Sequence, residues 1–210
     1  MLAQKIGITQ ARESQIEAGS GGGAPAQIYF ALGAALGLPF RYEFGRDRLV
    51  ELEDAGHLDI QELMLRLGRL AGYIRTFELA TRPAAPGLSV DVGLRDDVRR
   101  LLVLEECWNT FGNIGASIRN TRRKIAEAEA LAVAIGGEAG AFAVSACWVV
   151  RDSARNRDLL NRYPEVFRAT FTGSSTAWVR ALAYREADPP NEPGLVWCDL
   201  RAGRLIPWRS

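Results

Sequence analysis

Hydrophobic residues recur along this chain at two different spacings, and the spacing predicts where helices and strands lie. A spacing of three to four residues over 59–73 predicts a helix with Asp59 as its N-cap. The same spacing over 114–135 predicts a second long helix. Strands are predicted at 74–79 and, from short apolar runs, at 89–94, 101–109 and 141–150, the last of them buried.

The last third of the chain predicts helices and a hairpin. Residues 157–167, interrupted by Pro164, and residues 175–184 have helical patterns. Apolar segments at 195–200 and 204–208, separated by a glycine-containing turn, predict a pair of terminal strands.

The N-terminal part has only helical patterns, whereas the rest of the chain has both helical and strand patterns. Three short helical segments precede residue 40, and Thr9 is suited to cap the second of them, which Gly19 ends. We therefore predict a mixed α/β (α+β) protein. It has a short all-helical segment at 1–40, a charged linker with some helical character at 41–58 and a sheet domain at 59–210.

Acidic residues interrupt two of the predicted strands, although buried strands rarely carry them. Asp91 lies in the second strand, and Glu105 and Glu106 lie near the end of the third. A buried carboxylate needs an ionic partner or a metal, and Lys124 on the next helix is one candidate partner. This region is therefore the candidate site. We favour Glu106 over Glu105 because Glu106 alternates onto the same strand face as two leucines.

Purely structural roles account for the same residues. Asp91 would cap the following turn or pair with Arg95 or Arg99, and Glu105 or Glu106 would form a salt bridge with the next helix. The basic residues available there are Arg119, Arg123 and Lys124. A cluster of this kind is also typical of a solvated helix face. The sequence leaves both interpretations open.

Three N-terminal segments form a known pattern: LAQKIGITQ at 2–10, IEAG at 16–19 and ALGLP at 35–39. The pattern resembles the helix-turn-helix of phage-repressor-like (XRE or Cro type) regulators. The first helix of that family would precede Leu2, so we expect an incomplete module. The resemblance implies that the second helix reads bases in the major groove. Its candidate contact residues are Thr9, Gln10, Arg12, Glu13 and Gln15.

The predicted order of helix, three strands, helix and strand over 57–150 resembles the core of restriction-endonuclease-like, or PD-(D/E)XK, nucleases. The resemblance implies a three-layer α/β domain in which Asp91 and Glu106, with Glu105 as the alternative, hold Mg²⁺. Lys124 would then supply the catalytic cation from the helix, because Trp108 stands where the family carries its lysine. Phosphate contacts would come from Arg119, Arg122 and Arg123.

Composition limits the other classes of function. Lys and Arg total 26 against 25 Asp and Glu, so a DNA-binding surface must be local. The three cysteines each adjoin a tryptophan in an apolar run, a pattern typical of buried thiols in a reducing compartment. Because His57 is the only histidine, most zinc sites are excluded. We expect it on an exposed loop near a helix start. Neither a membrane span nor a signal peptide is indicated, so we expect a cytoplasmic protein without a membrane partner.

We therefore expect a DNA-binding protein, a transcriptional regulator that acts as a homodimer. Its nuclease-like domain would serve dimerisation or sensing, without an enzymatic activity. The first alternative is a magnesium-dependent deoxyribonuclease, a metal-dependent phosphodiesterase that uses Asp91, Glu106 and Lys124. The second alternative is a protein-interaction module that binds no nucleic acid and needs no cofactor.

Overall fold

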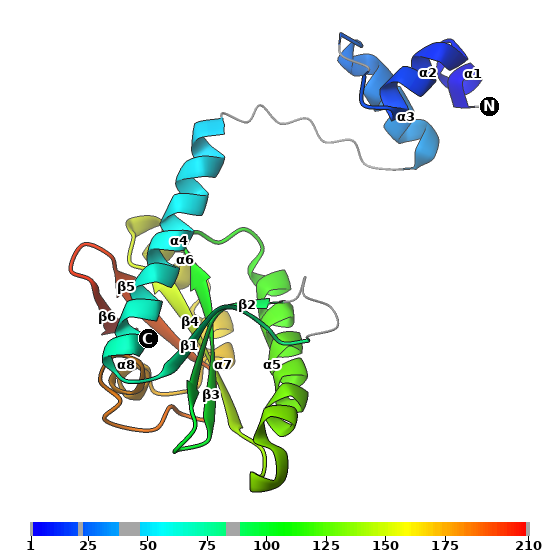
Figure 1. Cartoon of the computed structure of the whole chain (residues 1–210). Coiled ribbons are helices and arrows are strands. Elements are labelled where there is room, and N and C mark those ends of the chain that lie inside the picture. Colours follow the sequence, from blue (N-terminus) through cyan, green and yellow to red (C-terminus); the bar gives the residue numbers. More distant parts are fainter. Residues whose placement is uncertain (1, 21–22, 38–46, 83–88, 209–210) are drawn as a thin grey trace. The chain divides into compact units, whose positions relative to one another are not determined.

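The computed structural model describes residues 2–20, 23–37, 47–82 and 89–208, without the side chains of 47–54. The chain divides into two compact units, Met1–Arg46 and Asp47–Ser210 (Figure 1). Residues 38–46, where the predicted linker begins, lie outside the described residues. Each unit is described separately below.

The N-terminal unit contains the three predicted helices: α1 (Leu2–Ile6), α2 (Gln10–Glu17) and α3 (Ala26–Leu36). Gly7, with φ of 70°, lies in the short turn between α1 and α2. Thr9 caps α2 as predicted, because its hydroxyl accepts a hydrogen bond from the Arg12 backbone N–H at 3.2 Å. Ala3 is the only buried side chain among the described residues of this unit.

The second unit alternates helices with the strands of one sheet. Its elements are α4 (Asp47–Leu70), β1 (Ile74–Ala80), β2 (Ser89–Asp96), β3 (Leu101–Trp108), α5 (Ile114–Gly136), β4 (Ala143–Arg151), α6 (Ala154–Arg162), α7 (Pro164–Thr170), α8 (Ser175–Tyr184), β5 (Gly194–Asp199) and β6 (Arg204–Pro207). A short 3₁₀ turn, Gly137–Ala139, follows α5. The predicted mixed α/β class is confirmed.

The six strands lie side by side in their order along the chain. β1, β2 and β3 are antiparallel neighbours, β3, β4 and β5 are parallel, and β6 returns antiparallel to β5 as the predicted hairpin. The α5 helix connects β3 to the parallel strand β4, because a parallel connection needs a crossover.

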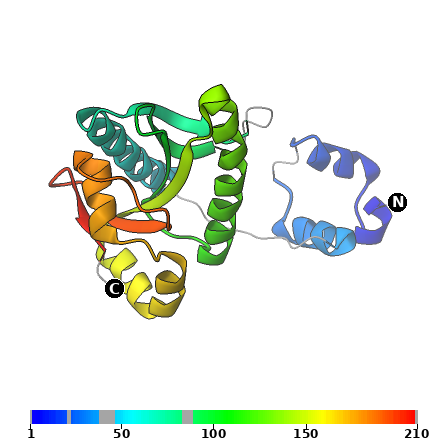
Figure 2. The same ribbon diagram turned by 90° about the horizontal axis from the view of Figure 1, so that it is seen from below.

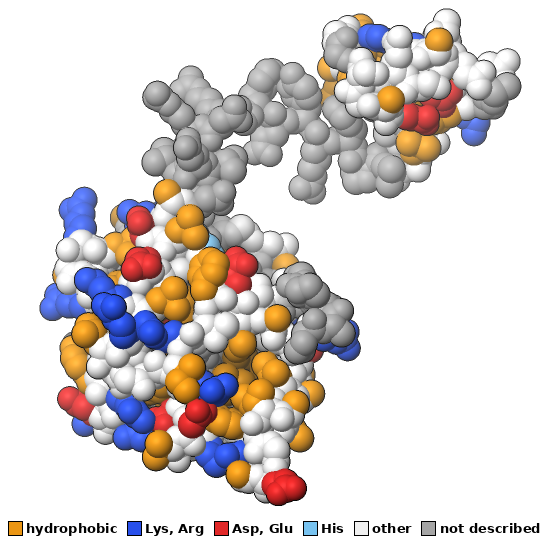
Figure 3. Space-filling model, viewed as in Figure 1, with side chains coloured by type: hydrophobic (Ala, Val, Ile, Leu, Met, Phe, Trp, Pro, Cys, Tyr) orange, Lys and Arg blue, Asp and Glu red, His pale blue; other side chains and the backbone are white. Residues whose placement is uncertain are grey.

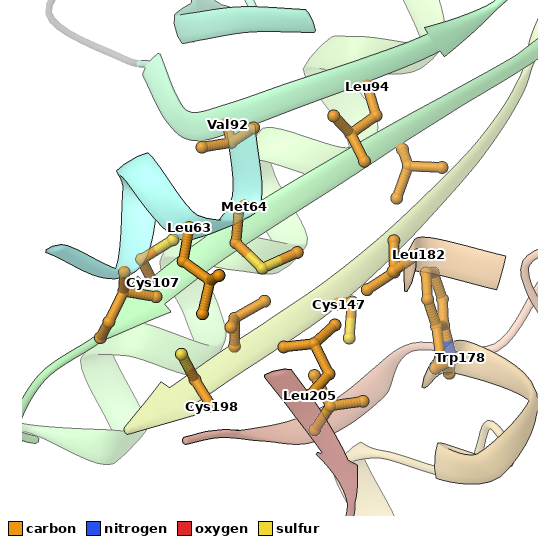
Figure 4. Close-up of a cluster of buried hydrophobic side chains, with 14 of the residues drawn as sticks. Leu63, Met64, Val92, Leu94, Cys107, Cys147, Trp178, Leu182, Cys198 and Leu205 are labelled. Atoms are coloured by element: carbon orange, nitrogen blue, oxygen red, sulfur yellow. The ribbon is translucent and has the colours of Figure 1, made fainter. Parts of the chain in front are cut away.

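Helices cover both faces of the sheet (Figures 1 and 2). On one face, Met64 of α4 and Trp178 of α8 pack on Val103 of β3, and Figure 4 shows part of this cluster. On the other face, Ala128 of α5 packs on Leu104 of β3. Helices α6 and α7 extend this second layer through an aromatic cluster centred on Trp148 of β4. Residues at neighbouring positions of β3 therefore enter two different cores.

Two sequence predictions need correction. The first long helix begins at Asp47 and not at Asp59, so residues 47–58 of the predicted linker are helical. The segment contains no proline and mostly residues that tolerate a helix well, which an argument from a single N-cap signal overlooks. For the same reason His57 lies inside α4 and not on a loop near a helix start.

Candidate functional site

Asp91 lies where the β2–β3 ladder ends. The last residue pair of that ladder is Val92 with Glu105, one position from Asp91. The Cys107 backbone N–H donates to Asp91 Oδ2 with an N···O distance of 2.6 Å. A side-chain carboxylate of β2 thus satisfies a backbone donor of β3 beyond the last pair, and this bond holds Asp91 at the end of β3.

Glu106 forms a buried ion pair with Lys124 of α5. Glu106 Oε1 lies 2.6 Å from Lys124 Nζ, and the two side chains are 8% and 14% exposed. The face that Glu106 shares with Leu102 and Leu104 is covered by α5, which brings Lys124 to it. Of the salt bridges that the sequence allowed, the one with Lys124 is present, and Asp91 is paired with neither Arg95 nor Arg99 among the described residues.

The turn after β2 is instead capped by Asp96. Its carboxylate accepts hydrogen bonds from the backbone N–H groups of Val98 and Arg99, each at 3.0 Å. Arg185, the C-cap residue of α8, completes this group, with its Nη2 atom 2.5 Å from Asp96 Oδ2. Asp91 is therefore not needed for the capping role that the sequence allowed, and its carboxylate is directed to the end of β3.

Glu105 points into the opposite core, beneath α4 and α8. It is fully buried, and both of its carboxyl oxygens lack a hydrogen-bond partner among the described residues. Burial raises the pKa of Glu105 to about 8, and the nearby negative charge of Asp91 adds to the rise. Glu105 is therefore largely a neutral acid at neutral pH, because an ionised carboxylate there would be unpaired.

The pKa of Glu106 is also raised, to about 7. Burial is the largest cause, Lys124 opposes it, and the Asp91 charge adds to the rise. The negative charge of Asp91 thus contributes to the raised pKa of both glutamates. Two of the three carboxyl groups, Asp91 and Glu106, together with Lys124, form what we call the acid–lysine centre.

His57 of α4 joins this centre, although sequence reasoning missed it. Its Nε2 atom lies 3.5 Å from Asp91 Oδ1, and its side chain is 36% exposed (the histidine is visible at the surface in Figure 3). The signal that could have found it is helical spacing. His57 lies three and seven residues before Ile60 and Met64, both fully buried, so the three share one side of the helix.

A separate polar network lies at the carboxyl ends of β3 and β4. The Asn109 side-chain oxygen accepts from Arg151 Nη1 at 2.8 Å, and Asn156 Nδ2 donates to the Asn109 and Arg151 carbonyls at 3.1 and 2.9 Å. Helix α4 approaches closely, since a Cβ placed on Gly56 would lie 2.4 Å from Asn109 Nδ2. In sheets with parallel strands, such carboxyl ends are where ligands bind.

The remaining predicted residues are exposed or half-buried. Arg119, Arg122 and Arg123 are exposed on α5, and Arg123 donates to Asn120 Oδ1 at 2.9 Å. In the N-terminal unit, Thr9, Gln10 and Gln15 are exposed. Arg12 and Glu13 are half-buried, and Arg12 Nη1 lies 3.1 Å from Gln15 Oε1.

Other kinds of site find less support. Among the described residues, no group of three or more histidine, cysteine, aspartate and glutamate side chains is placed to hold a metal ion. The cysteines Cys107, Cys147 and Cys198 are free and buried, and burial raises the pKa of each thiol. No described helix is long and apolar enough to cross a membrane.

Comparisons with known proteins add no relative. No protein-family model, no curated protein and no solved structure matches this chain. Two features of the chain bear on its function, the acid–lysine centre and the N-terminal helices.

Proposed function

We propose that this chain is a DNA-binding protein of the helix-turn-helix regulator type. The observation that carries the proposal is the geometry of α1 and α2, two helices joined by a three-residue turn that contains a glycine. Thr9 fixes the start of α2, so the exposed Gln10 lies in its first turn, where a recognition helix contacts bases. The glutamine amides are suited to adenine, and Arg12 is suited to guanine or phosphate.

The second unit would serve dimerisation or sensing in such a protein. A repressor-type operator requires two recognition helices, which a homodimer supplies. The six-stranded sheet, with its two buried cores, is a stable body on which such an interface can be built. Because the chain carries nearly equal numbers of basic and acidic residues, any DNA contact must come from a local surface.

Salt-dependent DNA binding tests this proposal. We expect the full chain to bind duplex DNA with an affinity that falls steeply as salt rises. Replacing Gln10 and Gln15 by alanine should weaken the preference for one sequence over another and leave the salt dependence nearly unchanged, because neither residue carries a charge. Absence of salt-dependent binding at low ionic strength would contradict the proposal.

The acid–lysine centre favours a second candidate, a magnesium-dependent deoxyribonuclease. Asp91, Glu106 and Lys124 come from three different elements and meet at one end of β3. The element order from α4 to β4 agrees with the nuclease-like order proposed from the sequence. An ion pair that only neutralises the buried Glu106 would account for the position of Lys124. It would not require Asp91 beside the same pair.

The donor set of this centre fits a magnesium ion that keeps several waters. Asp91 and Glu106 would hold the ion, because Mg²⁺ is commonly bound through one or two carboxylates. When bound, the ion would lower the pKa of a water and neutralise charge on the scissile phosphate. Lys124 would stabilise the negative charge that develops on the phosphate oxygens. His57, beside Asp91, is placed to hold a proton near the same position.

A nuclease assay decides between the two candidates. We expect supercoiled plasmid to be nicked with Mg²⁺ or Mn²⁺ if the enzyme candidate is right, and the Lys124→Met variant to be inactive. Plasmid that stays intact with either metal, while the same preparation binds DNA, leaves the regulator as the function.

A further inference from the structure

A hollow of about 490 Å³ lies beside α6, outside the acid–lysine centre. Its lining residues are Phe111, Arg155, Asn156, Asp158, Leu159 and Arg162. Arg155 and Arg162 are seven residues apart and so share one side of the helix, with their Cα atoms about 10 Å apart along its axis. We call this hollow the α6 pocket.

The two arginines of the α6 pocket differ from other arginines nearby. Arg157 pairs with Asp152 and lies over the Trp197 ring, and Arg168 pairs with Glu165. Arg155 and Arg162 form no ion pair among the described residues, and both are exposed. Two unneutralised guanidinium groups at the edge of a hollow are a suitable site for anionic oxygens.

The α6 pocket contacts the segment that follows the acid–lysine centre along the chain, through Asn109 and Asn156. Asn156 is 1% exposed, and its amide donates to the Asn109 carbonyl, three residues after Glu106. Phe111, which lines the pocket, follows Asn109 in the same segment. The pocket therefore lies beside the segment that follows β3, and the Asn156 hydrogen bond holds that segment against α6.

We propose that the α6 pocket binds one nucleotide unit of a nucleic-acid strand, with Arg155 and Arg162 on the two phosphates that flank it. The ring of Phe111 and the side chain of Leu159 supply apolar surface for the sugar. The Asp158 carboxylate, between the arginines, accepts a hydrogen bond from a base amine or a sugar hydroxyl. This site rests on the proposed nucleic-acid function and gives the second unit a direct role in it.

Asp158 allows a more specific test, because its negative charge opposes phosphate binding. The pocket carries two positive charges and one negative charge, so the carboxylate weakens the attraction of the arginines for phosphate. Removing the Asp158 charge should therefore strengthen phosphate binding, whereas removing the arginines should weaken it. Damage to the fold would weaken binding in every variant, so opposite effects identify an electrostatic site.

The test measures binding of the full chain to a labelled oligonucleotide over a range of salt concentrations. For Arg155→Ala with Arg162→Ala, we expect the slope of log affinity against log salt to fall by about 1.4 to 1.8, from two phosphate contacts at about 0.7 to 0.9 each. The matched control is Arg201→Ala with Arg204→Ala, which removes the same charge from two exposed arginines of the β5–β6 hairpin and should leave the slope unchanged. Asp158→Asn should bind more tightly than the wild type.

A free nucleotide carries the same phosphate, sugar and base as a nucleotide unit of a strand. A second measurement distinguishes these two ligands. If adenosine monophosphate raises the melting temperature of the wild type and not of the double arginine variant, the pocket takes free nucleotides. Wild-type binding with an unchanged slope in the double variant overturns the α6 site, and the helix-turn-helix proposal stands. A wild type that binds neither oligonucleotide nor nucleotide overturns both.

Discussion

Lys124 of α5 lies 2.6 Å from Glu106 of β3, in a pair that is almost completely buried. The helix thus brings a positive charge to the strand position where an unpaired carboxylate would be costly. Asp91, held by the Cys107 backbone N–H, is the third member of the centre. The arrangement makes predictions that do not depend on knowing a substrate.

The first prediction concerns Lys124→Met. Loss of the ammonium leaves Glu106 buried without its partner, and we expect a loss of about 3 kcal/mol in unfolding free energy at about pH 9. The loss should be smaller at about pH 6, because Glu106 then escapes the cost by taking up a proton. Urea unfolding at both pH values measures this. The control, Arg168→Ala, breaks an exposed pair and should change stability by less than about 1 kcal/mol.

The second prediction concerns Glu105, whose pKa is raised from 4.5 to about 8. The folded state therefore binds more protons than the unfolded state between these values, and the stability from this group is lost as pH rises through that range. We expect Glu105→Gln to flatten the fall in stability and to exceed the wild type by a few kcal/mol at about pH 9. Urea unfolding across this range provides the check. An equally steep fall in the variant would show that Glu105 is not the group responsible.

Much of the fold could be predicted from the sequence because its elements have strong local signals. The stripe of apolar residues in α5, the runs of β2 to β4 and the Thr9 cap all arise within a few residues of sequence. The start of α4 is harder to predict, because the many charged residues of 47–54 are typical of a linker, although Leu49 and Leu52 continue the helical spacing of apolar residues. Most residues of this segment tolerate a helix well, and the helix extends to Asp47.

The candidate site was only partly accessible to sequence reasoning. Asp91, Glu105 and Glu106 could be identified because carboxylates are unusual in buried strands, and Lys124 from its place on the next helix together with the nuclease resemblance. The split of the two glutamates between opposite cores follows from strand alternation, but the place of Asp91 depends on where the β2–β3 ladder ends. The approach of His57 depends on how α4 crosses the sheet, which sequence spacing does not determine.

The third prediction tests metal binding at Asp91 and Glu106. If the nuclease candidate is right, Mg²⁺ or Mn²⁺ should raise the melting temperature relative to chelator, because a ligand bound only by the folded state stabilises it. At 100 times the dissociation constant, the gain is about 2.7 kcal/mol. Asp91→Asn and Glu106→Gln should each abolish the metal effect. Melting curves that coincide with chelator and with metal would instead make these carboxylates structural.

The fourth prediction uses Gly56, where α4 passes the polar network at the end of β3. Alanine normally stabilises a helix relative to glycine by about 1 kcal/mol. At Gly56 we expect the opposite sign, a loss of about 1 kcal/mol or more, because the new Cβ would lie 2.4 Å from Asn109 Nδ2 and push Asn109 off Arg151. Gly115→Ala in α5 is the control. Its Cβ would meet nothing closer than 3.4 Å, so it should be neutral or slightly stabilising. Equal gains in both variants, measured by urea unfolding, would mean that α4 does not pass as close to Asn109 as this contact requires.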